Sequence, residues 1–208
     1  SRKEAISEGI LQDEMQRWVS AKFLHKNLTR DVEVRLKGVF PDHWTHSNRW
    51  SFKVKVKNNS KPFKNLNRFN LQTPETSSFM YEWVLMKALE KENLISLGID
   101  YYDLVVNGKN LGPYMLQGGI SDEVLKINKR EQGPIVGFSK DLFLKEFKNS
   151  QRMNKLGATG SLNGVEDNFW REKIQPVQFS NNNLGKIQEK YLKEAIYLLE
   201  AFRNEEKR

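Results

Sequence analysis

Three stretches near the start of the chain alternate between apolar and polar positions, which is the pattern of half-buried β-strands. They cover residues 17–27, 31–38 and 49–59. In the third stretch, the apolar residues Phe52, Val54 and Val56 alternate with Lys53, Lys55 and Lys57. A turn-rich link follows over residues 62–74 and has room for one more short strand. The pattern therefore predicts an antiparallel sheet with one apolar face.

Helical patterns dominate the rest of the chain. Residues 77–92 carry apolar side chains on almost all sides, which predicts a buried helix. Asn107-Gly108 lies between two apolar runs and predicts a β-hairpin with a tight turn. A short helix, a strand and a second helix are expected over residues 120–149, and a long loop over 150–180. The last segment predicts an amphipathic helix whose apolar stripe comprises Ile187, Tyr191, Ala195, Leu198 and Phe202.

The order of these elements predicts an α+β fold, in which helices pack on an antiparallel sheet. Residues 1–119 match the small lobe of a protein-kinase-like fold: strands, a helix packed on them, and a hairpin. Residues 120–208 would then hold a hinge, the beginning of a large lobe and the terminal helix. The stripe of that helix needs a cover, so we expect it to pack back on the chain or to drive self-association.

Composition narrows the class of partner. The 208 residues include 34 Lys and Arg against 26 Asp and Glu, and the net charge of +8 favours an anionic partner. The two signs are interleaved, which disfavours nucleic acid, although tryptophans at 18, 44 and 50 lie among basic residues. The absence of cysteine excludes disulfides, thiolate catalysis and cysteine-based zinc sites. No apolar run reaches the roughly 20 residues that a membrane-spanning helix needs.

Glu82 and the lysine row are the strongest candidates for chemistry. Glu82 is the only charged residue between Phe79 and Met86, and a carboxylate on a buried helix is costly unless it is paired. In kinase-like sites a strand lysine holds nucleotide phosphates and a helix glutamate orients it. Two alternatives stay open at this point. Glu82 can lie on a narrow exposed face, and the lysines can form the solvated face of an edge strand.

The remaining motifs are less specific. His43 and His46, with the carboxylate of Asp42 nearby, have a spacing that can ligate zinc. No further ligand is evident in the sequence, so a loop or turn is favoured. The chain has neither a P-loop nor a dinucleotide-binding fingerprint, and no nucleophile elbow.

Several segments, in this order, resemble the CotH kinase family, which is named for a bacterial spore-coat protein. They are "VEVRLKG", "DHW", "RWSFKVKVK", "NRFNLQTPET", "YEWVLMKALEKENLISLGIDYYDLVVNGKNLGPYMLQ", "NKREQGPIVGF" and "AIYLLEAFR". The resemblance covers the chain from about Arg30 to its end. Its most specific parts are "SFKVK", the helix with "YEW" and the hairpin around "NGK".

This resemblance implies an atypical protein kinase that is secreted or associated with the bacterial cell envelope, although the chain shows no signal peptide. Such a protein transfers phosphate from ATP to serine of coat or surface proteins, with Mg²⁺ or another divalent metal. Lys55, with Lys53 as second choice, would contact phosphate, and Glu82 would orient it. Arg35 and Lys37 would be secondary anion contacts, and the segment after Leu116 would be the hinge beside adenine.

Two departures from the family pattern bear on activity. The family commonly has a glutamate where this chain has Gln117, followed by Gly118 and Gly119. Gln117 can still hydrogen-bond a nucleotide. The catalytic loop and the metal-binding aspartate of the family are expected downstream of Arg208, so this stretch is expected to be incomplete as a catalyst. The alternative is a non-catalytic envelope or surface module that binds an anionic polymer or a partner protein.

Overall fold

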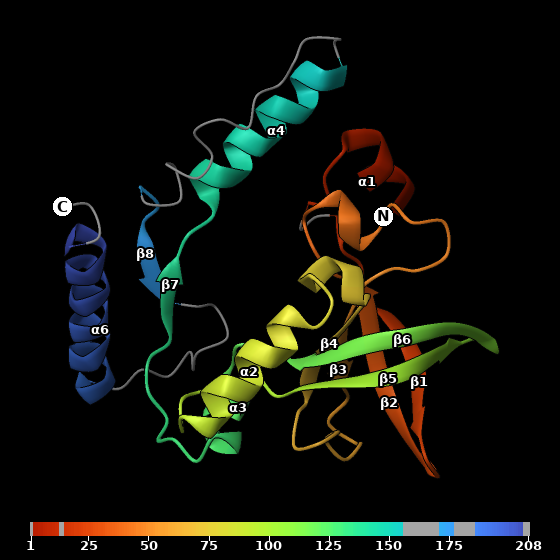
Figure 1. Cartoon of the computed structure of the whole chain (residues 1–208), viewed down its shortest axis with the longest axis horizontal. Helices are drawn as coiled ribbons and strands as arrows, with labels where there is room; N and C mark the ends of the chain where they lie inside the picture. Colours follow the sequence, from red (N-terminus) through yellow and green to blue (C-terminus); the bar gives the residue numbers. More distant parts are fainter. Residues whose placement is uncertain (1, 13–14, 156–170, 177–185, 206–208) are drawn as a thin grey trace. The chain divides into compact units, whose positions relative to one another are not determined.

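The computed structural model describes residues 2–12, 15–155, 171–176 and 186–205 and has an α+β fold (Figure 1). The chain forms two compact units, Ser1–Arg130 and Glu131–Arg208. The first unit contains a six-stranded sheet, and the second contains a two-stranded sheet with two long helices. The predicted fold class is therefore confirmed. Every residue predicted to form the site lies in the first unit.

The sheet of the first unit is antiparallel, with the strand order β1-β2-β3-β4-β6-β5. Its strands are β1 (Val19–His25), β2 (Leu28–Leu36), β3 (Phe52–Val56), β4 (Arg68–Gln72), β5 (Ile99–Val106) and β6 (Lys109–Gly118). The helices of the unit are α1 (Arg2–Glu8), α2 (Tyr81–Lys91) and α3 (Asp122–Ile127). Asn107 and Gly108 both have positive φ, +50° and +80°, which confirms the tight hairpin turn. Because β3 lies between β2 and β4, the edge-strand interpretation of its lysines is wrong.

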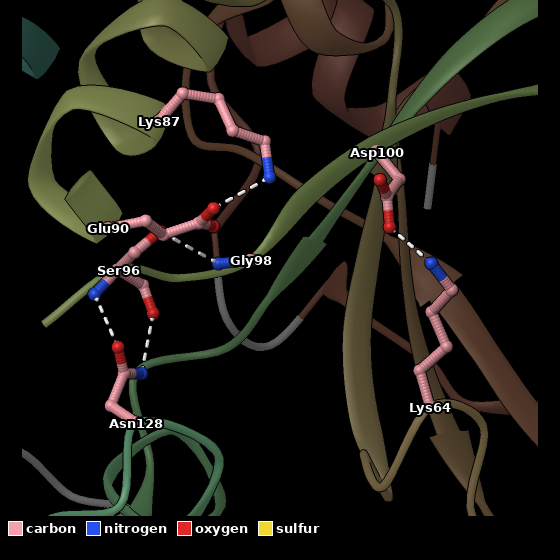
Figure 2. A network of polar contacts seen from close by, with 7 residues as sticks. All are labelled: Lys64, Lys87, Glu90, Ser96, Gly98, Asp100 and Asn128. Carbon is pink, nitrogen blue, oxygen red and sulfur yellow. Dashed lines mark hydrogen bonds and ion pairs between the residues drawn. The ribbon is translucent and has the colours of Figure 1, made fainter.

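One face of this sheet carries the hydrophobic core. Its buried cluster comprises Val32, Val54, Val56, Phe63, Leu66, Phe69, Leu71, Tyr114 and Leu116. The loop over residues 57–67 covers this face with Phe63 and Leu66, and Lys64 of the loop pairs with Asp100 of β5 (Figure 2). The sheet is also curled. The His25 ring of β1 lies 5.7 Å from the Tyr102 ring of β5, although these strands are the two edges of the sheet.

The prediction of a buried helix over residues 77–92 is wrong in its start and in its burial. A short 3-10 helix, Pro74–Ser77, comes first, and α2 begins only at Tyr81. Ser78 and Phe79 between them have positive φ, +50° and +58°, which breaks a continuous helix. None of the residues of α2 is buried, and Tyr81 is 80% exposed. The reason is that the core face is already covered by the loop over residues 57–67 and by the curl of the sheet.

The loop after α2 is held by side chains from α2 and from the end of α3 (Figure 2). The Asn128 amide accepts the Ser96 backbone N–H at 2.9 Å and donates to the Ser96 carbonyl at 2.8 Å. The Ser96 hydroxyl donates to Glu90 at 3.2 Å, and Glu90 pairs with Lys87 at 2.7 Å. Ser96 is 3% exposed, so these bonds satisfy groups that water does not reach. They fix the C-terminal end of α2 beside the start of β5.

The second unit is organised around Glu172. Its strands are β7 (Val136–Phe138) and β8 (Ile174–Pro176), and its helices are α4 (Asp141–Lys155) and α6 (Lys186–Glu205). The Glu172 carboxylate is 1% exposed, accepts the Phe143 N–H in the first turn of α4 at 2.8 Å, and is also bonded by the Ser139 hydroxyl. Arg203 of α6 donates to the Glu172 carbonyl at 2.8 Å. Glu172 therefore caps α4 and ties α6 to the same strand pair.

The predicted loop over residues 150–180 is wrong in two places, because α4 continues to Lys155 and β8 (Ile174–Pro176) forms within it. Residues 156–170 and 177–185 lie outside the described part of the chain. Helix α6 packs on β8 with its half-buried face, which includes Leu192, Ala195, Ile196 and Leu199. Of the predicted stripe, Tyr191, Leu198 and Phe202 are exposed, and the side chain of Ile187 is not described. Among the described helices, none combines the length and apolar character needed to cross a membrane.

Candidate functional site

The face of the sheet opposite the core gathers most of the predicted site residues. In the register of the sheet, Glu33 and Arg35 of β2 lie beside Lys55 and Lys53 of β3. These lysines lie beside Arg68 and Asn70 of β4, and Asn70 lies beside Gln117 of β6. Alternate side chains of a strand point to the same face, so Lys37, just beyond β2, shares this face too. We call it the lysine face; its predicted members are Arg35, Lys37, Lys53, Lys55 and Gln117.

The lysine face has a charged half and an apolar half. The charged half lies over β2, β3 and β4 and carries Arg35, Lys37, Lys53, Lys55 and Arg68, with Asp31 and Glu33 of β2 as its acidic residues. The apolar half lies over β5 and β6, where Ile99 and Met115 are buried. Helix α2 contacts β5, and the Tyr101 hydroxyl donates to the Phe79 carbonyl at 2.7 Å. A helix and a set of cations can therefore share one face of this sheet without the helix covering the cations.

Lys55 and Arg35 each contact a neighbouring side chain on the same face. The Lys55 Nζ lies 3.4 Å from the Glu33 Oε2, and the two side chains are 40% and 32% exposed. The Arg35 guanidinium lies over the Trp18 ring, 4.8 Å from its centroid. Such a half-exposed ion pair contributes little to stability. Lys55 is therefore half-exposed and paired with Glu33.

Glu82 lies on the same side of the sheet, at the start of α2, but its observed partner is an amide. The Gln117 Nε2 donates to the Glu82 Oε1, while Lys55 pairs with Glu33. Burial raises the pKa of Tyr101, and the negative charge of Glu82 adds to this shift. Glu82 in the first turn also stabilises the positive end of the helix. The structure thus brings Glu82 to the lysine face through Gln117 rather than through a lysine.

Gln72 is a member of this site that the sequence analysis missed. It ends β4, is 2% exposed, and accepts a hydrogen bond from the Lys37 Nζ. Its own amide donates to the Gln117 Oε1 at 3.5 Å, and Gln117 is 6% exposed. The alternation of Arg68, Asn70 and Gln72 against apolar neighbours was a signal for it. The signal is weak because turn-forming residues surround this short alternation.

Gly118, directly after Gln117, is required by close packing of the backbone. Its N–H donates to the Leu97 carbonyl at 3.0 Å. A Cβ at this position would lie 2.6 Å from the Leu97 carbonyl oxygen, closer than real contacts allow. The close approach of the loop before β5 therefore requires glycine at position 118.

The loop with Asp42, His43 and His46 has a structural role. The His43 Nδ1 lies 3.0 Å from the Ser51 hydroxyl, and the His46 Nδ1 accepts the N–H groups of Asn48 and Arg49 at 3.3 and 3.2 Å. Within the described ranges, no group of three or more His, Asp or Glu residues could hold a metal ion. These observations support the turn interpretation over the zinc interpretation.

His43 is expected to make stability fall in mild acid. Burial lowers its pKa to about 4, the charge of Lys37 adds to the shift, and Asp42 opposes it. In the unfolded chain the pKa is about 6.5, so between these values the unfolded state binds more protons and stability is lost as the pH falls. The partial exposure of His43 limits the loss to about 1–2 kcal/mol.

The test compares the wild-type protein with His43→Gln, which can keep a bond to Ser51. The free energy of unfolding is measured by urea denaturation at pH 7 and at pH 4.5. We expect the wild type to lose more stability than the variant over this interval, since all other titrating groups are common to both. Equal losses would show that His43 is not held neutral by the fold.

The three tryptophans do not form one exposed stacking platform. Trp44 is fully buried, and the Trp50 Nε1 donates to the His46 carbonyl at 2.7 Å. Trp18 is 41% exposed, and the Arg35 guanidinium lies over one face of its ring. A row of aromatic rings for successive bases is therefore absent from this set of residues.

The site fits phosphate oxygens better than a metal ion. Ammonium and guanidinium groups are the usual partners of phosphate, and they make up the charged half of the lysine face. Glu33 and Glu82, the carboxylates beside them, are each bonded to a neighbouring side chain. No family model matches the chain, and no curated protein matches it. Assignment to the CotH family therefore stays a prediction from the sequence motifs.

Proposed function

We propose that the chain is a kinase-like protein of the CotH family that binds ATP on the lysine face. The observation that carries this proposal is that Arg35, Lys37, Lys53, Lys55 and Gln117 share one face, with Glu82 bonded to Gln117 beside them. By the resemblance, the reaction is phosphoryl transfer from ATP to serine of a coat or surface protein, at the bacterial envelope or outside the cell.

The residues of the lysine face would bind and orient the phosphates. Lys53 and Lys55 would neutralise phosphate oxygens, with Arg35 and Lys37 as further contacts, because charge-assisted bonds to phosphate are short and strong. Mg²⁺ that accompanies ATP neutralises charge on the same oxygens. Within the part of the chain that the structure describes, no group of three or more His, Asp or Glu residues could hold this metal.

Calorimetric titration with ATP and Mg²⁺ tests the proposal. We expect wild-type protein to bind and Lys55→Ala to weaken binding by about tenfold, the effect of losing one charged hydrogen bond. Lys53→Ala is expected to act in the same direction. The matched control is Lys109→Ala, because Lys109 is an exposed lysine at the hairpin turn, outside the site. Folded wild-type protein that does not bind ATP, or equal affinity in all four proteins, would contradict the proposal.

A second candidate is a non-catalytic surface module that binds an anionic polymer. One observation favours it: Gln117 donates to Glu82 and Lys55 pairs with Glu33, so these two contacts stand where a Lys55–Glu82 ion pair was predicted. The charged half extends over three neighbouring strands, which suits a chain of phosphates as well as a single nucleotide. Long-chain polyphosphate that binds more tightly per phosphate than ATP, with a steep loss in salt, would favour this candidate.

We also propose that α6 contributes to self-association. Tyr191, Tyr197, Leu198 and Phe202 are each more than half exposed on this helix, and large apolar patches mark interaction surfaces. Light scattering after size exclusion is expected to show a dimer that Leu198→Lys converts to monomer, while Lys193→Gln on the same helix leaves the dimer intact. A wild-type protein that remains monomeric at high micromolar concentration would refute this proposal.

A further inference from the structure

Lys37 and Glu82 are linked by two side-chain amides. The Lys37 Nζ donates to the Gln72 Oε1, the Gln72 Nε2 donates to the Gln117 Oε1, and the Gln117 Nε2 donates to the Glu82 Oε1. We call this series the amide bridge. It begins just beyond β2, crosses the ends of β4 and β6, and ends in the first turn of α2.

The orientation of both amides follows from the two charged ends. An ammonium group only donates, so the Gln72 atom that faces Lys37 is oxygen. A carboxylate only accepts, so the Gln117 atom that faces Glu82 is nitrogen. The remaining nitrogen of Gln72 then faces the remaining oxygen of Gln117. Both dipoles therefore run from the cation towards the anion, and hydrogen bonds in such a series strengthen one another.

The amide bridge is one of the contacts that attach α2 to the sheet. No residue of α2 is fully buried, and its apolar side chains Trp83, Met86 and Leu89 are only half-buried. Gln72 and Gln117 are 2% and 6% exposed, and a buried amide that loses its partner is costly. Loss of the Lys37 hydrogen bond can therefore affect Glu82, because water does not reach Gln72 and Gln117 to replace their lost partners.

We propose that Gln72 and Gln117 are positioning residues that couple anion binding at Lys37 to the placement of α2. An anion that binds the Lys37 ammonium group competes with the Gln72 Oε1 for the hydrogen bonds of that group. Gln72 then holds Gln117 less firmly, and Gln117 holds Glu82 less firmly. The identity of the anion as phosphate rests on the proposed function, whereas the coupling between Lys37 and Glu82 does not.

The coupling is tested without any ligand by a double-mutant cycle. Lys37→Met, Glu82→Gln and the double variant are compared by urea denaturation, in the wild-type background and again with Gln72→Met. Residues without shared partners usually combine to within about a factor of two in the folding equilibrium constant. We expect a coupling of about three- to tenfold in the wild-type background and its loss with Gln72→Met. Additive effects in the wild-type background, or coupling that survives Gln72→Met, would overturn the proposal.

A second measurement includes the ligand. Hydrogen exchange of residues 81–91 is followed with and without tripolyphosphate in the wild type and in Gln72→Met. We expect tripolyphosphate to speed exchange of α2 in the wild type and to leave it unchanged in Gln72→Met, although both bind the ligand through Lys53 and Lys55. An equal response in both proteins would overturn the proposal. If tripolyphosphate binds neither protein, the proposed function fails, and the double-mutant cycle alone decides the coupling.

Discussion

Phe69→Ala is expected to remove about 3–5 kcal/mol from the free energy of unfolding of the first unit, the usual cost of deleting a core aromatic ring. Phe69 is 1% exposed and lies on the core face of β4. Its ring centroid lies 5.4 Å from that of Phe23 and 5.5 Å from that of Phe63. It therefore joins the first strand of the sheet to the loop over residues 57–67. Since domains are stable by only about 5–15 kcal/mol, the loss is a large share of the total.

Chemical denaturation of the full chain, followed by circular dichroism, measures this loss. Leu85→Ala is the control, because Leu85 is apolar and lies in a regular helix but is 54% exposed. We expect the control to change stability by less than about 1 kcal/mol. Phe69→Leu should fall between the two, since it keeps part of the apolar volume. A Phe69→Ala loss no greater than that of Leu85→Ala would mean that the core face is not packed as described.

Trp44→Ala is expected to release α1 from the first unit at a similar cost, about 3–5 kcal/mol. Trp44 is fully buried against Ala5 of α1 and against Leu11, with Leu36 of β2 packed beside them. Arg2 also donates to the Trp44 carbonyl at 2.8 Å, but that bond uses the backbone and survives the substitution. The variant thus separates the contribution of the buried ring from that of the arginine contact.

Hydrogen exchange of residues 2–11, together with thermal unfolding, checks this result. Exchange in that segment should rise in Trp44→Ala well before the sheet unfolds. Trp18→Ala is the control, since Trp18 is 41% exposed and its contact with Arg35 is worth only about 0.5–1 kcal/mol. Protection of residues 2–11 that is unchanged in Trp44→Ala would show that α1 is held by other contacts.

The strands and the hairpin could be predicted because their signals are local. A period of two residues identifies β2 and β3, and two residues with positive φ suit Asn107-Gly108. The exposure of α2 could not be predicted in the same way. An apolar helix indicates that it needs a cover, but not which surface provides it. Here the loop over residues 57–67 covers the core face, and no local signal marks the break at Ser78 and Phe79.

The candidate site also has one part that local signals predict and another part that depends on long-range contacts. Lys53 and Lys55 are two residues apart in one strand and therefore lie on the same face, so this part could be predicted from alternation alone. The partners of Glu82 and Lys55 depend on which residues of distant strands lie side by side. That register is set by long-range pairing, which brings Gln117 to Glu82 and Glu33 to Lys55. Alternation indicates the face on which Gln72 lies, but its contact with Gln117 depends on the pairing of β4 with β6.

The alternation in β3 separates two kinds of evolutionary constraint. Val54 and Val56 lie in the core cluster, while Lys53 and Lys55 lie on the opposite face of the same strand. Exchange of a lysine for another long polar residue alters the charge of one face and leaves the packing of the other intact. The charge of the lysine face can therefore change at nearly constant stability. The valines, by contrast, can change only together with their neighbours across the core.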